Sequence, residues 1–336
     1  MVFLFFFLMV PPPVMRGVYL SPGVLSSGKG ERMLVQLIRQ GVINAVVMDL
    51  KDERGTRYFR LCREKLQMYK KLGVYTIGRL PVFKDEFMAK KENGTFGLKT
   101  PEGYVWQDPI EGYWANPEDR MVWDYNIELA KRGFEMGFDE IQFDYIRYPS
   151  SHIPYIRTRN KTEVLCEFLD TAYARLKNMG WLGVDLYGFV CWQDTIPLEG
   201  QAIKHMGIRV DAVYPMLYPS HFGNNFLLDG SRERRTYEIV YLSLLNARYV
   251  LPYPEKRVVA YIQAFDWKRS TMGEKYIKNQ IKAAMDAVKF GCNGFILWEA
   301  GGNYKKAYEE LLEFIEEAKE NGDYSFLVGH PLPSSG

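Results

Sequence analysis

The feature that most constrains the fold is a regular alternation of short β-rich runs with amphipathic helical stretches, from Arg16 almost to the end of the chain. In the helical stretches apolar residues recur every three or four positions, as Leu34, Leu37 and Ile38 do. Strict alternation indicates parallel strands joined by right-handed crossovers. We predict strands at Gly17–Ser21, Asn44–Leu50, Val74–Pro81, Glu140–Ile146, Asp185–Cys191, Ala212–Leu217, Val258–Ala264 and Gly294–Trp298.

Eight β-α repeats predict an α/β fold of the (βα)₈ TIM-barrel type, formed as a single domain over residues 16–320. The alternative is a doubly wound open sheet, which usually has fewer strands and a Gly-rich phosphate turn after its first strand. Here the first strand leads into Ser21, Pro22 and Gly23, with no G-x-G-x-x-G pattern. The sequence therefore favours the barrel.

One connection, after the third strand, is much longer than the others. It runs between Phe83 and Pro117, is rich in Gly, Trp and Tyr, and includes Trp114 and Asn116. Long loops within compact domains are usually functional or disordered, and this one is too aromatic for disorder. We expect a lid or a substrate wall at the mouth of the barrel.

The two ends of the chain differ from the repeats. Residues 1–10 are almost entirely apolar and precede three prolines; they are too few to span a bilayer but suit the apolar core of a signal peptide. No Lys or Arg precedes them and no small-residue cleavage site follows. We predict that residues 1–15 are an atypical signal or anchor segment, which would export the protein or attach it to the membrane or envelope. A mis-assigned start, leaving a cytoplasmic protein, is the alternative. We expect residues 321–336 to form a loose tail.

The amino-acid composition limits the kinds of molecule that the protein is expected to bind. The net charge is +2 without any basic block, which argues against nucleic acid. Aromatic residues make up 15% of the chain, and since sugars present apolar C–H faces that stack on such rings, this excess favours a carbohydrate. The four Cys are scattered and the four His form no metal-binding run, so we predict no metal and no cofactor.

Polar side chains gather where the predicted strands end, which is where barrel enzymes carry out their chemistry. In chain order these candidates are Asp49, Lys51, Arg79, Gln142, Asp144, Arg147, Asp194, Tyr214, Tyr218, His221, Gln263, Trp298 and Glu299. From the long connection we add Trp114 and Asn116. Trp114, Tyr218 and Trp298 are candidates for stacking on sugar rings, and Gln142, Gln263 and Asn116 for binding hydroxyls.

Asp144 is the central candidate because it ends a run, Ile-Gln-Phe-Asp-Tyr-Ile, that otherwise reads as a buried strand. A charge there costs several kcal/mol unless it is paired. Arg79 on the neighbouring strand is a suitable partner and would hold Asp144 ionised, as a nucleophile or base requires. The alternative is an ion pair that only closes the end of the barrel.

Glycoside hydrolysis needs a second, protonated carboxyl group across the bond. Glu299, between Trp298 and Ala300, and Asp194 are both candidates for this acid. Asp49 ranks third, because the nearby Lys51 would lower its pKa.

Several long motifs occur in order along the strands: VVMDLKDERG, GRLPVFKD, GFDEIQFDYIRYP and YPMLYPSHF. Through them the chain resembles a bacterial family called the putative glycosyl hydrolase domain, distantly similar to the α-amylase and melibiase clans, over Arg16 to Glu320. The resemblance implies a TIM barrel that hydrolyses glycosidic bonds. In the similar clans the nucleophile is an Asp ending the fourth strand, which corresponds to Asp144. Their acid ends strand five or six, which favours Asp194 over Glu299.

Two other functions remain open. A barrel that binds polysaccharide without cleaving it would lack a carboxyl pair within about 5–10 Å across the mouth. A phosphate-handling isomerase or aldolase is suggested by Gly301 and Gly302 after the last strand, although no Lys ends the sixth strand to form a Schiff base. No motif specifies the linkage, the anomer or the oligomeric state.

Overall fold

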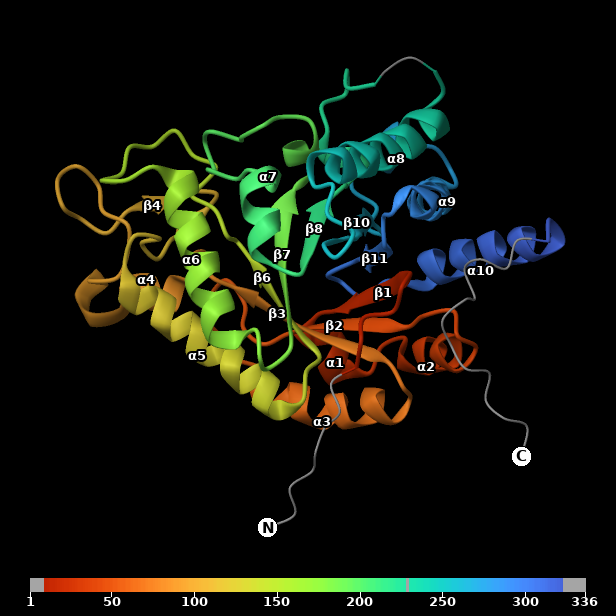
Figure 1. Cartoon of the computed structure of the whole chain (residues 1–336), viewed down its shortest axis with the longest axis horizontal. Coiled ribbons are helices and arrows are strands. Elements are labelled where there is room, and N and C mark those ends of the chain that lie inside the picture. Colours follow the sequence, from red (N-terminus) through yellow and green to blue (C-terminus); the bar gives the residue numbers. More distant parts are fainter. Residues whose placement is uncertain (1–8, 228–229, 323–336) are drawn as a thin grey trace, which may run out of the picture.

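The structure, a computed structural model, describes residues 9–227 and 230–322 and confirms the (βα)₈ barrel (Figure 1). Parallel pairing runs in the order β10-β11-β1-β2-β3-β6-β7-β8-β9, and a further pairing of β10 with β8 closes the barrel. β9 and β10 are two segments of one barrel strand. The barrel strands are β1 (Met15–Leu20), β2 (Ala45–Asp49), β3 (Tyr75–Pro81), β6 (Glu140–Asp144), β7 (Trp181–Tyr187), β8 (Ala212–Met216), β9 (Arg257–Val258), β10 (Ala260–Gln263) and β11 (Gly294–Trp298).

Helices surround the barrel and cover the outer face of its strands (Figure 1). Several begin at the side-chain caps that their sequences provide: Asn160 accepts a hydrogen bond from the backbone of Glu163, and Ser231 from that of Arg234. The helices are α1 (Pro22–Ser27), α2 (Glu31–Arg39), α3 (Phe59–Lys71), α4 (Glu86–Gly94), α5 (Arg120–Met136), α6 (Lys161–Leu176), α7 (Ile203–Met206), α8 (Arg232–Val250), α9 (Tyr276–Asp286) and α10 (Lys305–Glu320).

The fifth barrel strand differs from its prediction in a way that matters for the site. β7 begins at Trp181, not at Asp185, and after Tyr187 the chain turns into a short 3₁₀ helix, Gly188–Cys191. Gly183 hides the start of this strand, because glycine weakens a strand pattern. A side chain at Gly183 would collide with Glu140 and Tyr214, so the packing of the barrel interior requires a glycine there.

Tyrosines fill much of the barrel interior. Tyr75 and Tyr214 both donate hydrogen bonds to the buried carboxylate of Glu140, at 2.9 and 2.6 Å. Nearer the mouth, the Tyr261 hydroxyl donates to Oε1 of Gln142 at 2.5 Å. This polar layer forms the floor under the C-terminal ends of the strands.

The long connection after β3 folds as α4 followed by a small hairpin of β4 (Gln107–Asp108) and β5 (Gly112–Tyr113). It is anchored by Lys51, whose fully buried ammonium group donates to Asp85 and to Asn126. Asp85 also caps α4 by accepting from the backbone of Met88 at 2.8 Å. The connection is thus an ordered part of the barrel.

The predictions for the two ends of the chain fall mostly outside the described residues. Residues 1–8 of the expected signal or anchor segment and residues 323–336 of the expected tail are among those not described. Within residues 9–227 and 230–322, none of the helices combines the length and the apolar character that crossing a membrane requires.

Candidate active site

A cavity of about 450 Å³ opens at the C-terminal ends of the barrel strands, where barrel enzymes carry their active sites. Its walls combine carboxyl groups, guanidinium groups and aromatic rings from β3, β6, β7, β8, β10 and β11 and from the segments that follow them. The lining residues are Arg79, Asp144, Tyr145, Arg147, Asp185, Tyr187, Gly188, Phe189, Gln201, Met216, Tyr218, His221, Phe222, Tyr261 and Trp298.

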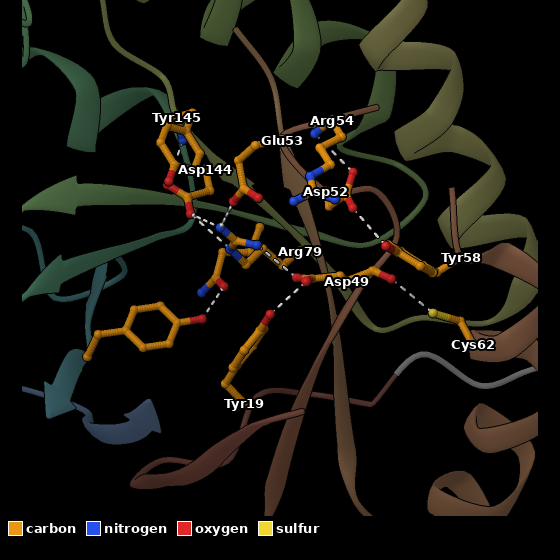
Figure 2. Close-up of polar contacts among 12 residues, drawn as sticks. Tyr19, Asp49, Asp52, Glu53, Arg54, Tyr58, Cys62, Arg79, Asp144 and Tyr145 are labelled. Carbon is orange, nitrogen blue, oxygen red and sulfur yellow. Dashed lines mark hydrogen bonds and ion pairs between the residues drawn. The ribbon is translucent and has the colours of Figure 1, made fainter. Parts of the chain in front are cut away.

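Arg79, on β3, is the centre of a buried charge network (Figure 2). Its Nε and Nη2 donate to the same oxygen of Asp144, at 2.8 and 2.6 Å, and its Nη1 donates to Asp49 at 2.8 Å. Nη2 also contacts Glu53 at 3.0 Å. Burial by itself would lower the pKa of Arg79, but the three carboxylates raise it well above its usual value. Arg79 is therefore a permanent cation surrounded by acids.

Two stacked rings fix the other side of this network. Tyr19 and Trp298 lie with ring centroids 3.8 Å apart, and the Arg79 guanidinium lies 5.0 Å from the Trp298 centroid. The Tyr19 hydroxyl donates to Asp49 at 2.6 Å. Burial raises the pKa of Asp49 to about 6, against the lowering effect of Arg79.

Asp144, at the end of β6, is held at both carboxylate oxygens. One oxygen accepts the two bonds from Arg79, and the other accepts the backbone N–H of Tyr145 at 2.5 Å. These charge-assisted bonds stabilise the carboxylate form and fix its orientation. Tyr145 has a φ of 51°, which a residue with a side chain seldom adopts, so the chain turns sharply at this point.

Asp185, on β7, is the important residue that the sequence prediction missed. Phe143 pairs with Val184 across β6 and β7, so the following residues, Asp144 and Asp185, lie side by side. Burial, and then the neighbouring charge of Asp144, raise the pKa of Asp185 well above its usual value. Its Oδ1 is buried and accepts no hydrogen bond from the described residues. The cavity thus holds a carboxylate bonded to Arg79 next to a carboxyl group whose charged form is disfavoured by burial.

Alternation along β7 is the signal that could have found Asp185. Leu182, Val184 and Leu186 are buried against the helix layer, so the residues between them point into the barrel. The prediction started the strand at Asp185 itself. This placed Asp185 at the N-terminal end of the strand, away from the mouth of the barrel.

Six of the predicted site residues line the cavity: Arg79, Asp144, Arg147, Tyr218, His221 and Trp298. Asp49 joins them indirectly, through its ion pair with Arg79. Three more lie deeper in the barrel, with Gln142 and Tyr214 hydrogen-bonded to partners in the floor and Gln263 buried beneath the loop that follows β10.

The structure does not place the two predicted acids in the cavity. Asp194 is exposed and lies beyond the 3₁₀ helix that follows β7, in a separate small depression that includes Tyr249. Glu299 follows β11, but its carboxylate accepts the backbone N–H groups of Gly301 and Asn303, at 2.8 and 2.5 Å. It stabilises a turn rather than facing the cavity, because backbone donors in the Gly301–Asn303 turn lie within its reach.

Three further candidates support the long connection. Lys51 forms the buried pair with Asp85, and Asn116 accepts the backbone N–H of Glu118 in a turn. Trp114 is fully buried, so its ring is not open to a sugar. The Trp114 ring packs against Arg147, whose guanidinium lies 4.6 Å from the centroid of that ring.

Arg147 forms one wall of the cavity and ties the long connection to it. Its Nη2 donates to Glu111 at 3.2 Å, and its Nη1 to the backbone oxygen of Tyr148 at 3.0 Å. The ring of Tyr187 lies 4.8 Å from the guanidinium. Within the described ranges, no three His, Cys, Asp or Glu side chains converge as metal ligands would.

Residues 17–304 match the sequence profile of the family described as "Putative glycosyl hydrolase domain". The chain belongs to this family. This confirms the resemblance drawn from the strand motifs. No curated protein matches the chain in sequence.

Several solved structures of carbohydrate-active proteins share this fold. The glycoside hydrolase domain of PgaB (BpsB) from Bordetella bronchiseptica superposes with a TM-score of 0.63 at 14% identity, covering 89% of this chain and 98% of that one. The endo-β-1,4-mannanase from Thermotoga petrophila superposes with a TM-score of 0.60 at 14% identity, covering 93% of this chain and 78% of that one. The catalytic domain of β-amylase from Paenibacillus polymyxa superposes with a TM-score of 0.56 at 11% identity, covering 92% of this chain and 99% of that one. At these identities the similarity establishes the fold alone.

Proposed function

We propose that the protein hydrolyses an O-glycosidic bond in an oligo- or polysaccharide, with Asp144 and Asp185 as its pair of carboxyl groups. The observation that carries the proposal is the juxtaposition of these two acids in one cavity in different surroundings: Asp144 is bonded to Arg79, whereas burial raises the pKa of Asp185. Glycosidases need this combination, because one group must donate a proton while the other acts as an anion.

Each acid has a distinct role. Asp185 gives its proton to the glycosidic oxygen, so that the leaving sugar departs as a neutral alcohol. Asp144, as a carboxylate bonded to Arg79, attacks the anomeric carbon, and water activated by the ionised Asp185 then releases the sugar and restores both groups. Asp144 and Asp185 are neighbours on adjacent strands, whose backbones lie about 4.8 Å apart, so their side chains are close enough to act on one bond.

The charge distribution argues against the phosphate-handling alternative. Arg79 is already shared by three carboxylates, Asp49, Glu53 and Asp144, and Arg147 is paired with Glu111. Both guanidinium groups of the cavity are therefore neutralised, and a phosphate would meet excess negative charge. A neutral sugar, which gains positive character at its anomeric carbon during the reaction, suits the same cavity better.

The test is a screen of α- and β-linked oligosaccharides with the wild type, Asp144→Asn, Asp185→Asn and Asp194→Asn. We expect the wild type to cleave at least one substrate, and both cavity variants to lose roughly 10²–10⁴-fold in kcat/KM. Asp194→Asn is the matched control, an exposed carboxyl group outside the cavity, and should act as the wild type does. Absence of cleavage by the wild type, or full activity of Asp144→Asn, would show that the proposal is wrong.

A further inference from the structure

Four aromatic side chains form a continuous rim beside the cavity: Tyr218, His221, Phe265 and Trp267. Ring centroids lie 5.4 Å apart for Tyr218 and Phe265, and 5.2 Å apart for both Tyr218–His221 and His221–Trp267. Tyr218 and His221 also line the cavity, whereas Trp267 lies farther out. We call these four residues the aromatic rim.

A buried side chain holds the loop of the rim in place. Nε2 of Gln263, on β10, donates to the backbone oxygens of both Phe265 and Trp267, each at 3.0 Å, while its Oε1 accepts the backbone N–H of Ser220 at 3.2 Å. One amide thus joins the loop after β10 to the turn after β8. The backbone at Trp267 is therefore held in place before any ligand arrives.

Trp267 is nonetheless 53% exposed, although a ring of this size would gain stability from burial. Lys268 lies 4.5 Å from its centroid, and His221 contacts it edge-on. A half-exposed indole on an anchored backbone beside a cavity is a favourable surface for stacking, because the electron-rich face of the ring attracts the polarised C–H groups of a sugar. A pyranose ring has such a C–H face.

We propose that the aromatic rim is a second sugar subsite, with Trp267 stacking on a neutral sugar unit of the same glycan that enters the cavity. The inference rests on the proposed function, since it assigns the glycan to both places. It follows from the continuity of the rim with the cavity through Tyr218 and His221. The protein would then recognise chains of several units better than disaccharides.

The test uses the full-length chain in two assays, with Trp267→Ala and with Tyr249→Ala as the control. Tyr249 is 85% exposed near the C-terminal end of α8, outside the rim and the cavity. The first assay is electrophoresis through gels that contain soluble starch, galactomannan or glycol chitin, which measures binding without hydrolysis. The second compares kcat/KM for disaccharides and hexasaccharides of whichever linkage is cleaved.

We expect Trp267→Ala to raise the Kd for the retained polysaccharide on the order of tenfold, while Tyr249→Ala leaves it unchanged. The loss in kcat/KM should appear with hexasaccharides and not with disaccharides. The rim proposal is overturned if the wild type is retarded by none of the gels, or if Trp267→Ala is retarded as strongly as the wild type. Equal losses for both substrate lengths would also overturn it. If retardation depends on Trp267 but the wild type hydrolyses no substrate, the subsite proposal is supported and the proposed glycosidase activity is refuted.

Discussion

At the scale of single residues, the site depends on how differently the protein treats two adjacent aspartates. Asp144 receives three hydrogen bonds, two of them from Arg79, whereas Asp185 is buried with a carboxylate oxygen that accepts none from the described residues. Like charges on neighbouring strands cannot both be ionised cheaply, and burial together with the charge of Asp144 disfavours the charged form of Asp185.

This difference predicts the pH dependence of the reaction. Because the pKa of Asp185 is raised and the acid acts in its protonated form, kcat/KM should fall as the pH rises through that pKa. Asp185→Ala should abolish this alkaline limb. The kcat/KM of the variant should also fall roughly 10²–10⁴-fold on unactivated glycosides. It should fall far less on 2,4-dinitrophenyl glycosides, whose leaving group needs no proton. Equal losses on both substrate types would assign Asp185 a role other than acid.

At the scale of elements, the small β4–β5 hairpin connects the long insertion to the cavity. Asp108 accepts the backbone N–H groups of Ile110 and Glu111, both at 2.7 Å, and the hydroxyl of Ser151 at 2.6 Å. The Ser151 and backbone bonds lower the pKa of Asp108. The tightened turn places Glu111 against Arg147, so one carboxylate organises both the hairpin and the cavity wall behind it.

Asp108→Ala should loosen this hairpin without unfolding the barrel. The loss of two turn bonds and of the link to Ser151 should cost about 1–3 kcal/mol locally. Hydrogen exchange at the amides of Ile110 and Glu111 should accelerate at least about tenfold, while the barrel strands stay protected. Glu102→Ala, an exposed carboxylate in the same connection, is the control. Faster exchange throughout the barrel would contradict a local role.

The sequence predicted the elements better than the site, and the difference has a physical basis. Strands and helices reveal themselves through periodic burial, and the barrel, the long connection and the Arg79–Asp144 pair all followed from that periodicity. The start of the fifth strand was misplaced because Gly183 interrupts its pattern, so Asp194 was expected at the mouth of the barrel and Asp185 was not. Glu299 lies outside the cavity for another reason: its backbone partners depend on a local turn, which no periodicity encodes.

At the scale of the whole molecule, the barrel interior contains several carboxyl groups whose burial favours the protonated form. Burial raises the pKa of Asp49 to about 6 and that of Glu140 to about 7, despite hydrogen bonds that act in the opposite direction. The pKa of Asp185 is raised as well. Between the ordinary pKa of these groups and the raised values, the three groups bind more protons in the folded protein than in the unfolded chain. Their contribution to the free energy of unfolding therefore falls as the pH rises through this range.

Glu140→Gln isolates one part of this effect. Glu140 faces the hydroxyls of Tyr75 and Tyr214, with Arg257 and Asp211 also acting on it, and its stabilising contribution should be lost between about pH 4.5 and 7. A neutral amide cannot lose a proton in this range. The free energy of unfolding of the variant should therefore fall between pH 5 and 8 by about 1–3 kcal/mol less than that of the wild type. Urea unfolding at several pH values measures this slope. Glu135→Gln, an exposed carboxyl group on α5, should leave the slope unchanged. If Glu140→Gln declines as steeply as the wild type, the pH dependence arises elsewhere in the barrel.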